Sequence, residues 1–302
     1  MVWKCRRMYK YDGVENPRLK MKGTKMRRIS VFAVAVTLLL PAFVAAQEGR
    51  GAGPGGPSPE ARKEAAERYA AADIRVLVPG IVYNSGLLDL AAAYTKETGK
   101  KVAVTLIGMG GIVNAVRTAN PPADVVSLPF DLMTTLSLDG IIVPGTFLPL
   151  GRSEMGIAVR AGSPHPDIST VEKLAAALRS AKEVMRSNPA GGSMVAKVIE
   201  DKVIKRPELA GVNSRVSTQG EGGQALARGE GDMAIQAICE ILPYKQIELV
   251  APLPRELAAW IDMSAAVSSR GAHREDGLAF LKYLLRPEST TVWKTKGLDR
   301  FN

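Results

Sequence analysis

Four segments rich in glycine or other small residues stand where a short apolar run gives way to an amphipathic one. Backbone N–H groups at a helix start have no intrahelical partner, and glycine lets a ligand approach them closely. With the positive end of the helix dipole, such groups bind anions. Glycine is common in turns of this kind, so the prediction depends on four of them occurring together. We expect them to hold one small ligand through Asn84, Ser85, Gly86, Gly110, Gly111, Gly191, Gly192, Ser193, Gly222 and Gly223.

Other kinds of chemistry lack the residues they need. His165 and His273 have neither metal-ligand spacing nor a nucleophile beside them, and Cys239 lies in the apolar segment IQAICEIL, which is typical of a buried side chain. The sequence also contains no P-loop and no complete G-x-G-x-x-G fingerprint. We therefore predict no catalytic residue, no metal and no cofactor, and a protein that is not an enzyme.

The net charge of +10 is concentrated at the N-terminus. Residues 1–46 contain 10 of the 40 Lys and Arg residues but 2 of the 30 Asp and Glu residues. The remaining chain is therefore close to neutral and has no basic stripe, which argues against nucleic acid as a partner.

The same N-terminal region resembles an export signal. Arg27 and Arg28 precede an apolar run from Ile29 to Ala46, which ends in small residues suited to signal peptidase. An uncleaved membrane anchor is the alternative, and Met26 could begin an ordinary signal peptide, which leaves open whether residues 1–25 are translated. We expect residues 1–46 to be an N-terminal extension and signal peptide, and residues 47–72 a flexible linker. The protein would then function in the periplasm or on the extracellular side of the membrane.

From Ile74 onward, predicted strands and helices alternate, which indicates an α/β fold with parallel strands. The first unit is the strand, turn and helix of residues 74–99, with Leu87, Leu90 and Tyr94 on one helix face and Gly99 at the end. In such sheets, turns after the strands lie at their carboxyl ends, where ligands bind. The four turns should therefore face a common space.

Residues 74–301 resemble the molybdate-type extracellular solute-binding proteins of ABC transporters. The resemblance is carried by the segments SGLLDLAAAYTKETGKKV, PPADVVSLP, GIAVRAGSPHPDIST, NPAGGS, ALARGEGDMAIQAICEILP, ELVAPLP and SAAVSS. It implies a two-lobed type 2 periplasmic-binding-protein fold with two hinge crossovers. Lobe one would comprise residues 73–152 with 247–302, and lobe two residues 153–246.

The resemblance also implies a function. The protein would be a monomeric receptor that closes on a small molecule or oxyanion and delivers it to an ABC permease in the membrane. Family contacts match the four turns, and a further contact after the strand before the hinge matches Gln236. A secreted α/β enzyme or a non-transport ligand sensor using the same cleft is the alternative.

Two features leave the ligand open. The turn at Gly110 and Gly111 has no hydroxyl, whereas molybdate sites are rich in neutral hydroxyl donors. Glu221 in the fourth turn would repel a dianion, although Arg186 could offset that charge.

Overall fold

The computed structural model describes residues 58–191 and 193–301, so the predicted leader and residues 47–57 of the predicted linker lie outside it. The strands form one mixed sheet in the order β2-β1-β3-β9-β4-β7-β5-β6, with β8 paired to β4. The predicted α/β fold is confirmed. No helix in the described ranges is long and apolar enough to cross a membrane.

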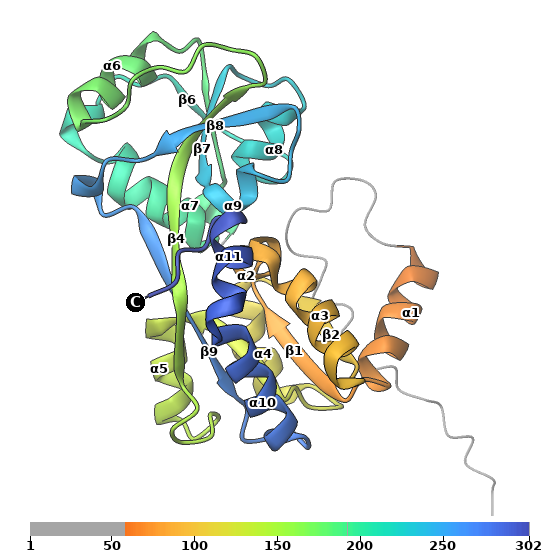
Figure 1. The fold of residues 1–302 in the computed structure, drawn as a ribbon. Coiled ribbons are helices and arrows are strands. Elements are labelled where there is room, and N and C mark those ends of the chain that lie inside the picture. Colours follow the sequence, from red (N-terminus) through yellow and green to blue (C-terminus); the bar gives the residue numbers. More distant parts are fainter. Residues whose placement is uncertain (1–57, 192, 302) are drawn as a thin grey trace, which may run out of the picture. The chain divides into compact units, whose positions relative to one another are not determined.

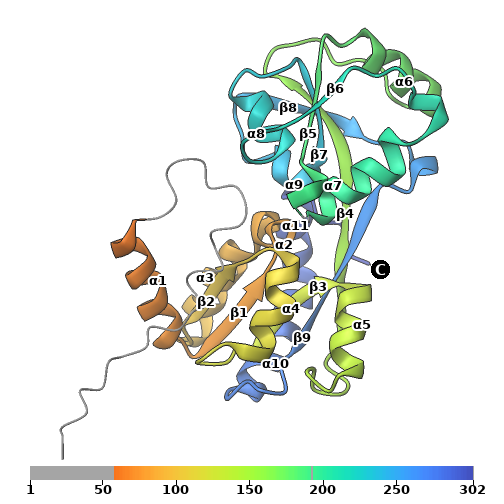
Figure 2. The ribbon, with the colours of Figure 1, turned by 180° about the vertical axis from the view of Figure 1, so that it is seen from behind.

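Lobe one is built on three parallel strands and one antiparallel strand: β1 (Ile74–Val78), β2 (Val102–Leu106), β3 (Val125–Pro129) and β9 (Trp260–Val267). Helices cover both faces, and every residue of β1 and β3 is buried, including Arg75 and Ser127. In Figure 1 the helices in front of the sheet are α3 (Leu88–Thr98), α10 (Arg274–Leu285) and α11 (Pro287–Thr295). Figure 2 shows the opposite face, covered by α4 (Met109–Thr118) and α5 (Phe130–Leu138).

Lobe two is a smaller sheet with short helices around it. Its strands are β5 (Val184–Arg186), β6 (Ser214–Val216), β7 (Met233–Ala237) and β8 (Ile247–Pro252). Strand β5 is parallel to both β6 and β7, so the carboxyl ends of these three strands share one edge. Its helices are α6 (Val171–Ser180), α7 (Met194–Ile199), α8 (Gly222–Ala227) and α9 (Ile238–Ile241).

Strand β4 (Leu148–Arg160) belongs to both lobes. Its first half, up to Glu154, pairs with β9, and its second half, from Met155, pairs with β7 and β8 (Figure 1). Because β8 pairs with the lobe-two half of β4, the strand pairing favours a second crossover at residues 253–259 rather than the predicted boundary between residues 246 and 247.

The second part of the predicted linker, residues 58–72, is largely helical. Helix α1 (Pro59–Ala70) is capped by the Ser58 hydroxyl, which accepts a hydrogen bond from the Ala61 N–H at 3.1 Å. At its other end, the buried Arg75 side chain donates to the carbonyls of Tyr69 and Ala70, at 3.0 and 2.9 Å. An arginine at a helix C-terminus satisfies carbonyls that have no intrahelical partner, which fixes α1 on lobe one.

Candidate functional site

Two helices begin side by side at the carboxyl edge of the lobe-one sheet. Strands β1 and β2 are parallel with Val78 opposite Leu106, and the Ile107 N–H donates to the Val78 carbonyl at 3.0 Å. Helix α2 (Gly80–Val82) follows β1 and α4 follows β2, and neither has a side-chain cap. Gly110 and Gly111 lie in the first turn of α4, where N–H groups lack intrahelical partners. Their position is the predicted one, and their ligand contact remains a prediction.

The first predicted turn is not at a helix start. The helix begins at Gly80, directly after Pro79, and Asn84, Ser85 and Gly86 lie inside it, in the π-helical turn Tyr83–Leu87. Gly86 has φ 102°, a conformation that favours glycine, and bends the helix where it meets α11. The N–H groups without intrahelical partners are therefore those in the first turn of α2, which begins at Gly80. They are not, as predicted, those of Asn84, Ser85 and Gly86.

These three residues have different surroundings. The buried Ser85 hydroxyl donates to the Ile81 carbonyl at 2.6 Å, and a methyl group added to Gly86 would lie 2.8 Å from Val292 Cγ1. Gly86 thus packs inside lobe one, whereas the Ser85 hydroxyl also interacts with the Cys239 thiol of α9. Asn84 is half-buried, and its Nδ2 would lie 4.0 Å from a methyl group placed on Gly80. Of the three, Asn84 is the residue whose side chain lies at the start of α2.

In lobe two, a directional chain of hydrogen bonds joins the ends of β5 and β7. The Gly222 N–H donates to Ser187 Oγ at 3.2 Å, and the Ser187 hydroxyl donates to Gln236 Oε1 at 2.8 Å. Gln236 Nε2 in turn donates to Glu240 Oε2. The Gln236 amide thus accepts at Oε1 and donates at Nε2. Ser187 thereby brings Gln236 and Gly222 together, and their ligand contacts remain a prediction.

Two carboxyl groups lie at this edge. Glu221 caps α8 and accepts the Gln224 N–H, while Gln224 Oε1 accepts the Glu221 N–H at 3.0 Å. Glu221 Oε2 is buried and has no hydrogen-bond partner among the described residues. Burial, followed by the negative charge of Glu221, raises the pKa of the half-buried Glu240 carboxyl to about 8, and the hydrogen bond from Gln236 opposes that rise.

Glu240 also lies against lobe one. A methyl group placed on Gly80 would be 3.0 Å from Glu240 Oε1, and α9 packs on α2 and on the π-helical turn. Glu240 is therefore at the start of α2, near Asn84. Gly223 lies beside them, since a methyl group there would lie 3.5 Å from Gln236 Cγ and from the Glu240 carbonyl oxygen. These residues form one cluster around Glu240: Gly80, Asn84, Ser187, Glu221, Gly222, Gly223, Gln236 and Glu240.

The family model for bacterial extracellular solute-binding proteins matches residues 83–299. The chain belongs to this family. A curated relative, aconitate isomerase from Pseudomonas sp, is 28% identical over 215 residues, which are 70% of this chain and 81% of that protein. The periplasmic molybdate-binding protein of Azotobacter vinelandii is similar in structure, with a TM-score of 0.58 and 17% identity over 76% of this chain and all of that one.

The sulfate-binding protein of Mycobacterium tuberculosis H37Rv is similar too, with a TM-score of 0.58 and 18% identity over 76% of this chain and 87% of that one. These structures share the two-lobed periplasmic-binding-protein fold, which confirms the predicted fold class and the resemblance to molybdate-type proteins. At such identities, similarity extends to the fold and not to the ligand.

The third predicted turn of this solute-binding protein is only partly described. Gly191 ends the 3₁₀ turn Pro189–Gly191, and Gly192 lies outside the described residues. Ser193 caps α7, its Oγ accepting the Ala196 N–H at 3.3 Å. The expectation that Arg186 offsets Glu221 is wrong, because its guanidinium donates to Glu200 Oε2 at 2.8 Å and to Ser214 Oγ at 3.2 Å instead.

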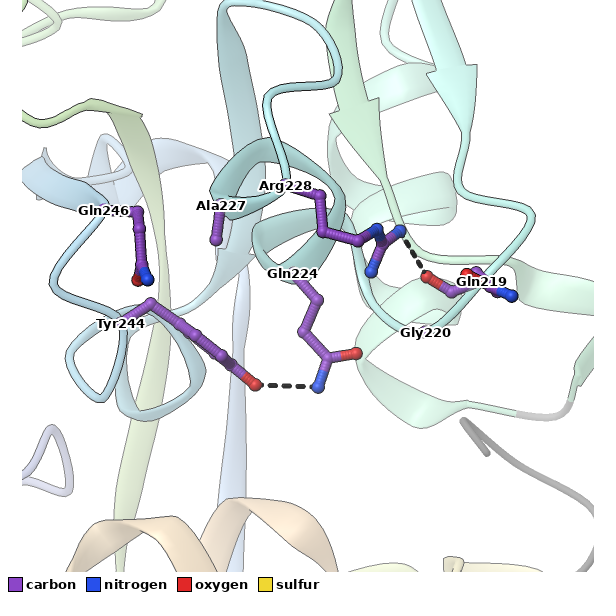
Figure 3. A pocket seen from close by; sticks show the side chains of 7 residues that line it. All are labelled: Gln219, Gly220, Gln224, Ala227, Arg228, Tyr244 and Gln246. Carbon is purple, nitrogen blue, oxygen red and sulfur yellow. Dashed lines mark hydrogen bonds between the residues drawn. The ribbon is translucent and has the colours of Figure 1, made fainter. Parts of the chain in front are cut away.

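A cavity of about 430 Å³ lies elsewhere on lobe two (Figure 3). Its lining residues are Gln219, Gly220, Gln224, Ala227, Arg228, Tyr244 and Gln246. Gln224 Nε2 donates to the Tyr244 hydroxyl at 2.7 Å, and Arg228 donates to the Gln219 carbonyl at 2.7 Å. None of the predicted site residues lines this cavity, although Gln224, which forms the capping box with Glu221, does.

Three residues of the cluster escaped sequence analysis: Gly80, Ser187 and Glu240. Gly80 and Ser187 each stand within two residues of a strand end, so the rule used for the other turns could have found them. Glu240 is the third residue of a four-residue helix among apolar neighbours, and its sequence context carries no comparable signal. Cys239 is buried as predicted, and burial raises the pKa of its thiol to about 12.

Replacing Ser187 with Ala should destabilise lobe two by about 1–3 kcal/mol, because it leaves the Gly222 N–H and Gln236 Oε1 without partners in a buried place. Urea denaturation followed by circular dichroism measures this loss. Ser193→Ala is the matched control, since it removes a half-buried cap of another helix. Equal stability of Ser187→Ala and the unmodified protein would contradict the chain of hydrogen bonds.

Proposed function

We propose that this protein is an exported receptor of an ABC importer, which binds a small ligand between its two lobes and presents it to a membrane permease. The observation that supports this proposal is the convergence of Gly80 and Asn84 from lobe one with Gln236 and Glu240 from lobe two. A ligand at this place touches both lobes, and contacts made only in the closed form shift the population toward closure. Molybdate or a related oxyanion is one candidate ligand.

As a receptor, the protein requires no catalytic residue, cofactor or metal, and we propose that it acts as a monomer in the periplasm after removal of the leader. No group of three or more His, Cys, Asp or Glu side chains suited to a metal occurs in residues 58–191 and 193–301. The other predicted contacts, from Gly110, Gly111, Gly192, Ser193 and Gly223, belong to the same proposal.

Protein beginning at Gln47 should be stabilised by its ligand by about 2.7 kcal/mol when the ligand is present at a hundred times its Kd. Thermal unfolding with a panel of molybdate, sulfate, cis- and trans-aconitate and amino acids measures this effect. The panel contains both oxyanions and organic acids, so it ranks the ligand classes directly. A panel that produces no shift with any compound would contradict the receptor proposal.

The relative named aconitate isomerase, with the two carboxyl groups of the cluster, favours a second candidate function. The protein would move a proton along an unsaturated organic acid. One carboxylate would remove a proton from the carbon next to the double bond, and the electron pair of that C–H bond would form the new double bond. The old double bond would break at the same time, and its electron pair would take a proton at the far carbon. The reaction consumes no oxidant and no cofactor.

Proton NMR of cis-aconitate in D₂O with purified protein distinguishes the two functions. An isomerase produces trans-aconitate and incorporates deuterium at carbon, whereas a receptor shifts and broadens the signals without new ones. Glu221→Gln separates them further, because a receptor for anions should keep or improve binding and an isomerase should lose turnover.

A further inference from the structure

The cavity on lobe two is not used by the proposed receptor function (Figure 3). Its volume of about 430 Å³ lies within the range of small-molecule sites. Two segments line it: residues 219–228, which run from the turn after β6 through α8, and residues 244–246, which follow α9. Both segments belong to lobe two, so the shape of the cavity does not depend on closure of the lobes.

One wall of the cavity is held in place by Gln224. Its Oε1 accepts the Glu221 N–H at 3.0 Å, and its Nε2 donates to the Tyr244 hydroxyl at 2.7 Å. Gly220 makes room for this side chain, since a methyl group there would lie 2.0 Å from Gln224 Oε1, and its φ of 70° favours glycine. A carboxamide bonded through both of its polar atoms loses little further conformational entropy when a ligand binds, so this wall is preorganised.

The described lining of the cavity carries no unmatched charge. Among these lining residues Arg228 is the charged one, and its Nη2 and Nε donate to Glu230 Oε1 at 2.8 and 3.1 Å. Glu230 also pairs with Arg215, which pairs in turn with Glu183, so two positive and two negative groups balance. A charged ligand would give up hydration without gaining a free opposite charge. The cavity therefore favours a neutral ligand.

The polar groups free to meet a ligand include a phenol hydroxyl and a carboxamide. The Tyr244 hydroxyl accepts from Gln224 and retains its own proton, for which the described residues offer no acceptor. The exposed Gln246 carboxamide likewise has no hydrogen-bond partner among the described residues, and it lies on the same side of the cavity as Tyr244 (Figure 3). A ligand hydroxyl can accept from the first group and can both accept from and donate to the second. The half-buried Tyr244 ring and Ala227 add apolar surface beside these groups.

We propose that this cavity is a second ligand site of the protein, which takes a neutral polyhydroxylated molecule such as a monosaccharide. Each hydroxyl group of such a molecule both donates and accepts, as Tyr244 and Gln246 require, and the C–H groups of a sugar ring pack on the aromatic side chain. Gln246 and Arg228 are exposed, so the site is open, and a monosaccharide should bind with a Kd on the order of 1 mM. Binding here goes beyond the proposed receptor function and does not require it.

Heteronuclear NMR of isotope-labelled protein beginning at Gln47 locates the site. Titration with glucose, N-acetylglucosamine, myo-inositol and glycerol should move the backbone amide signals of Tyr244 and Gln246 but not those of Gln236 and Glu240. Glucosamine and glucuronate are the charged counterparts and should bind at least about tenfold more weakly than glucose. Signal changes confined to the cluster around Glu240, no change with any compound, or equally strong binding of the charged sugars would overturn the proposal.

Two substitutions test the contacts themselves. Tyr244→Phe keeps the ring but removes the hydroxyl, and Gln246→Ala removes the exposed carboxamide, so each should raise the Kd of glucose about fivefold. Lys245→Ala is the matched control, because Lys245 is exposed between these residues in the sequence and does not line the cavity, and the Kd should not change. Circular dichroism establishes that each variant folds. A Kd that is unchanged in both test variants, or raised equally in Lys245→Ala, contradicts the assignment.

The same titrations separate this site from the receptor function. Binding of glucose at Tyr244 and Gln246, with no response to molybdate, sulfate, aconitate or amino acids, would contradict the receptor function alone. Binding of one of those compounds at Gln236 and Glu240, with no response to any neutral sugar or polyol, would contradict the second site alone.

Discussion

Replacing Asp124 with Ala should lower the free energy of unfolding by about 3–5 kcal/mol, among the largest effects that a single substitution can have here. The side chain is fully buried at the start of β3 and accepts the N–H groups of Arg75 and His273, both at 2.9 Å. It also pairs with the buried Arg75 guanidinium at 3.5 Å. Removal leaves a buried positive charge and two N–H groups without their acceptor.

Urea denaturation at constant pH measures the loss. Asp124→Asn is the informative control, because it removes the charge but keeps one acceptor oxygen, and its loss should fall between those of the unmodified protein and Asp124→Ala. Helix α1 should be less stably packed on lobe one in Asp124→Ala, since Arg75 also donates to the carbonyls of Tyr69 and Ala70. A loss below about 1 kcal/mol, the range of exposed ion pairs, would show that Arg75 finds another partner.

Replacing Trp293 with Ala should cost about 3–5 kcal/mol, as expected for a fully buried large aromatic side chain. Trp293 fills the space under α11, and its Nε1 donates to the Leu284 carbonyl at 2.9 Å, which joins α11 to α10. The neighbouring Val292 packs against Gly86 in the π-helical turn. The substitution therefore weakens the support of the segment that carries Asn84.

Thermal and urea denaturation measure the stability of this variant, and hydrogen exchange of the Tyr83–Leu87 amides reports on the site. Trp293→Phe retains a ring but not the hydrogen bond, and should lose less stability than Trp293→Ala. Unchanged exchange in the π-helical turn of Trp293→Ala, with stability reduced as expected, would show that α11 does not support the turn.

The elements of the fold could be predicted where one pattern dominates. Strands β1 and β3 are apolar except for Arg75 and Ser127, and Gly99 ends α3 with φ 73°, so apolar runs and a helix-stop residue were sufficient. The start of the first helix was wrong because Ile81 and Val82 extend the apolar run of β1, while Asn84-Ser85-Gly86 has the composition of a turn. A π-helical turn has no composition of its own that could have indicated it.

The site was predictable to the extent that it depends on strand ends. Gln236 was implied by the family resemblance, and Gly222 and Gly223 by their turn, and the structure brings all three together. Glu240 could not be placed, because its importance comes from contact with Gly80, 160 positions away in sequence. The pairing of Arg186 with Glu200 likewise depends on a helix position that charge patterns do not specify.

Met155 is the residue at which β4 changes neighbours. Its N–H donates to the Ala259 carbonyl and its carbonyl accepts the Leu253 N–H, both at 2.9 Å, while Ala237 lies opposite it on β7. Both ends of the second crossover, residues 253–259, are thus hydrogen-bonded to the same residue. Ala258 within this crossover has φ 48°. Rotation of one lobe on the other would then have its fulcrum at Met155. Helix α9 begins directly after Ala237, so Glu240 is close to the centre of this rotation. It should therefore stay beside Gly80 while the outer parts of lobe two move much farther.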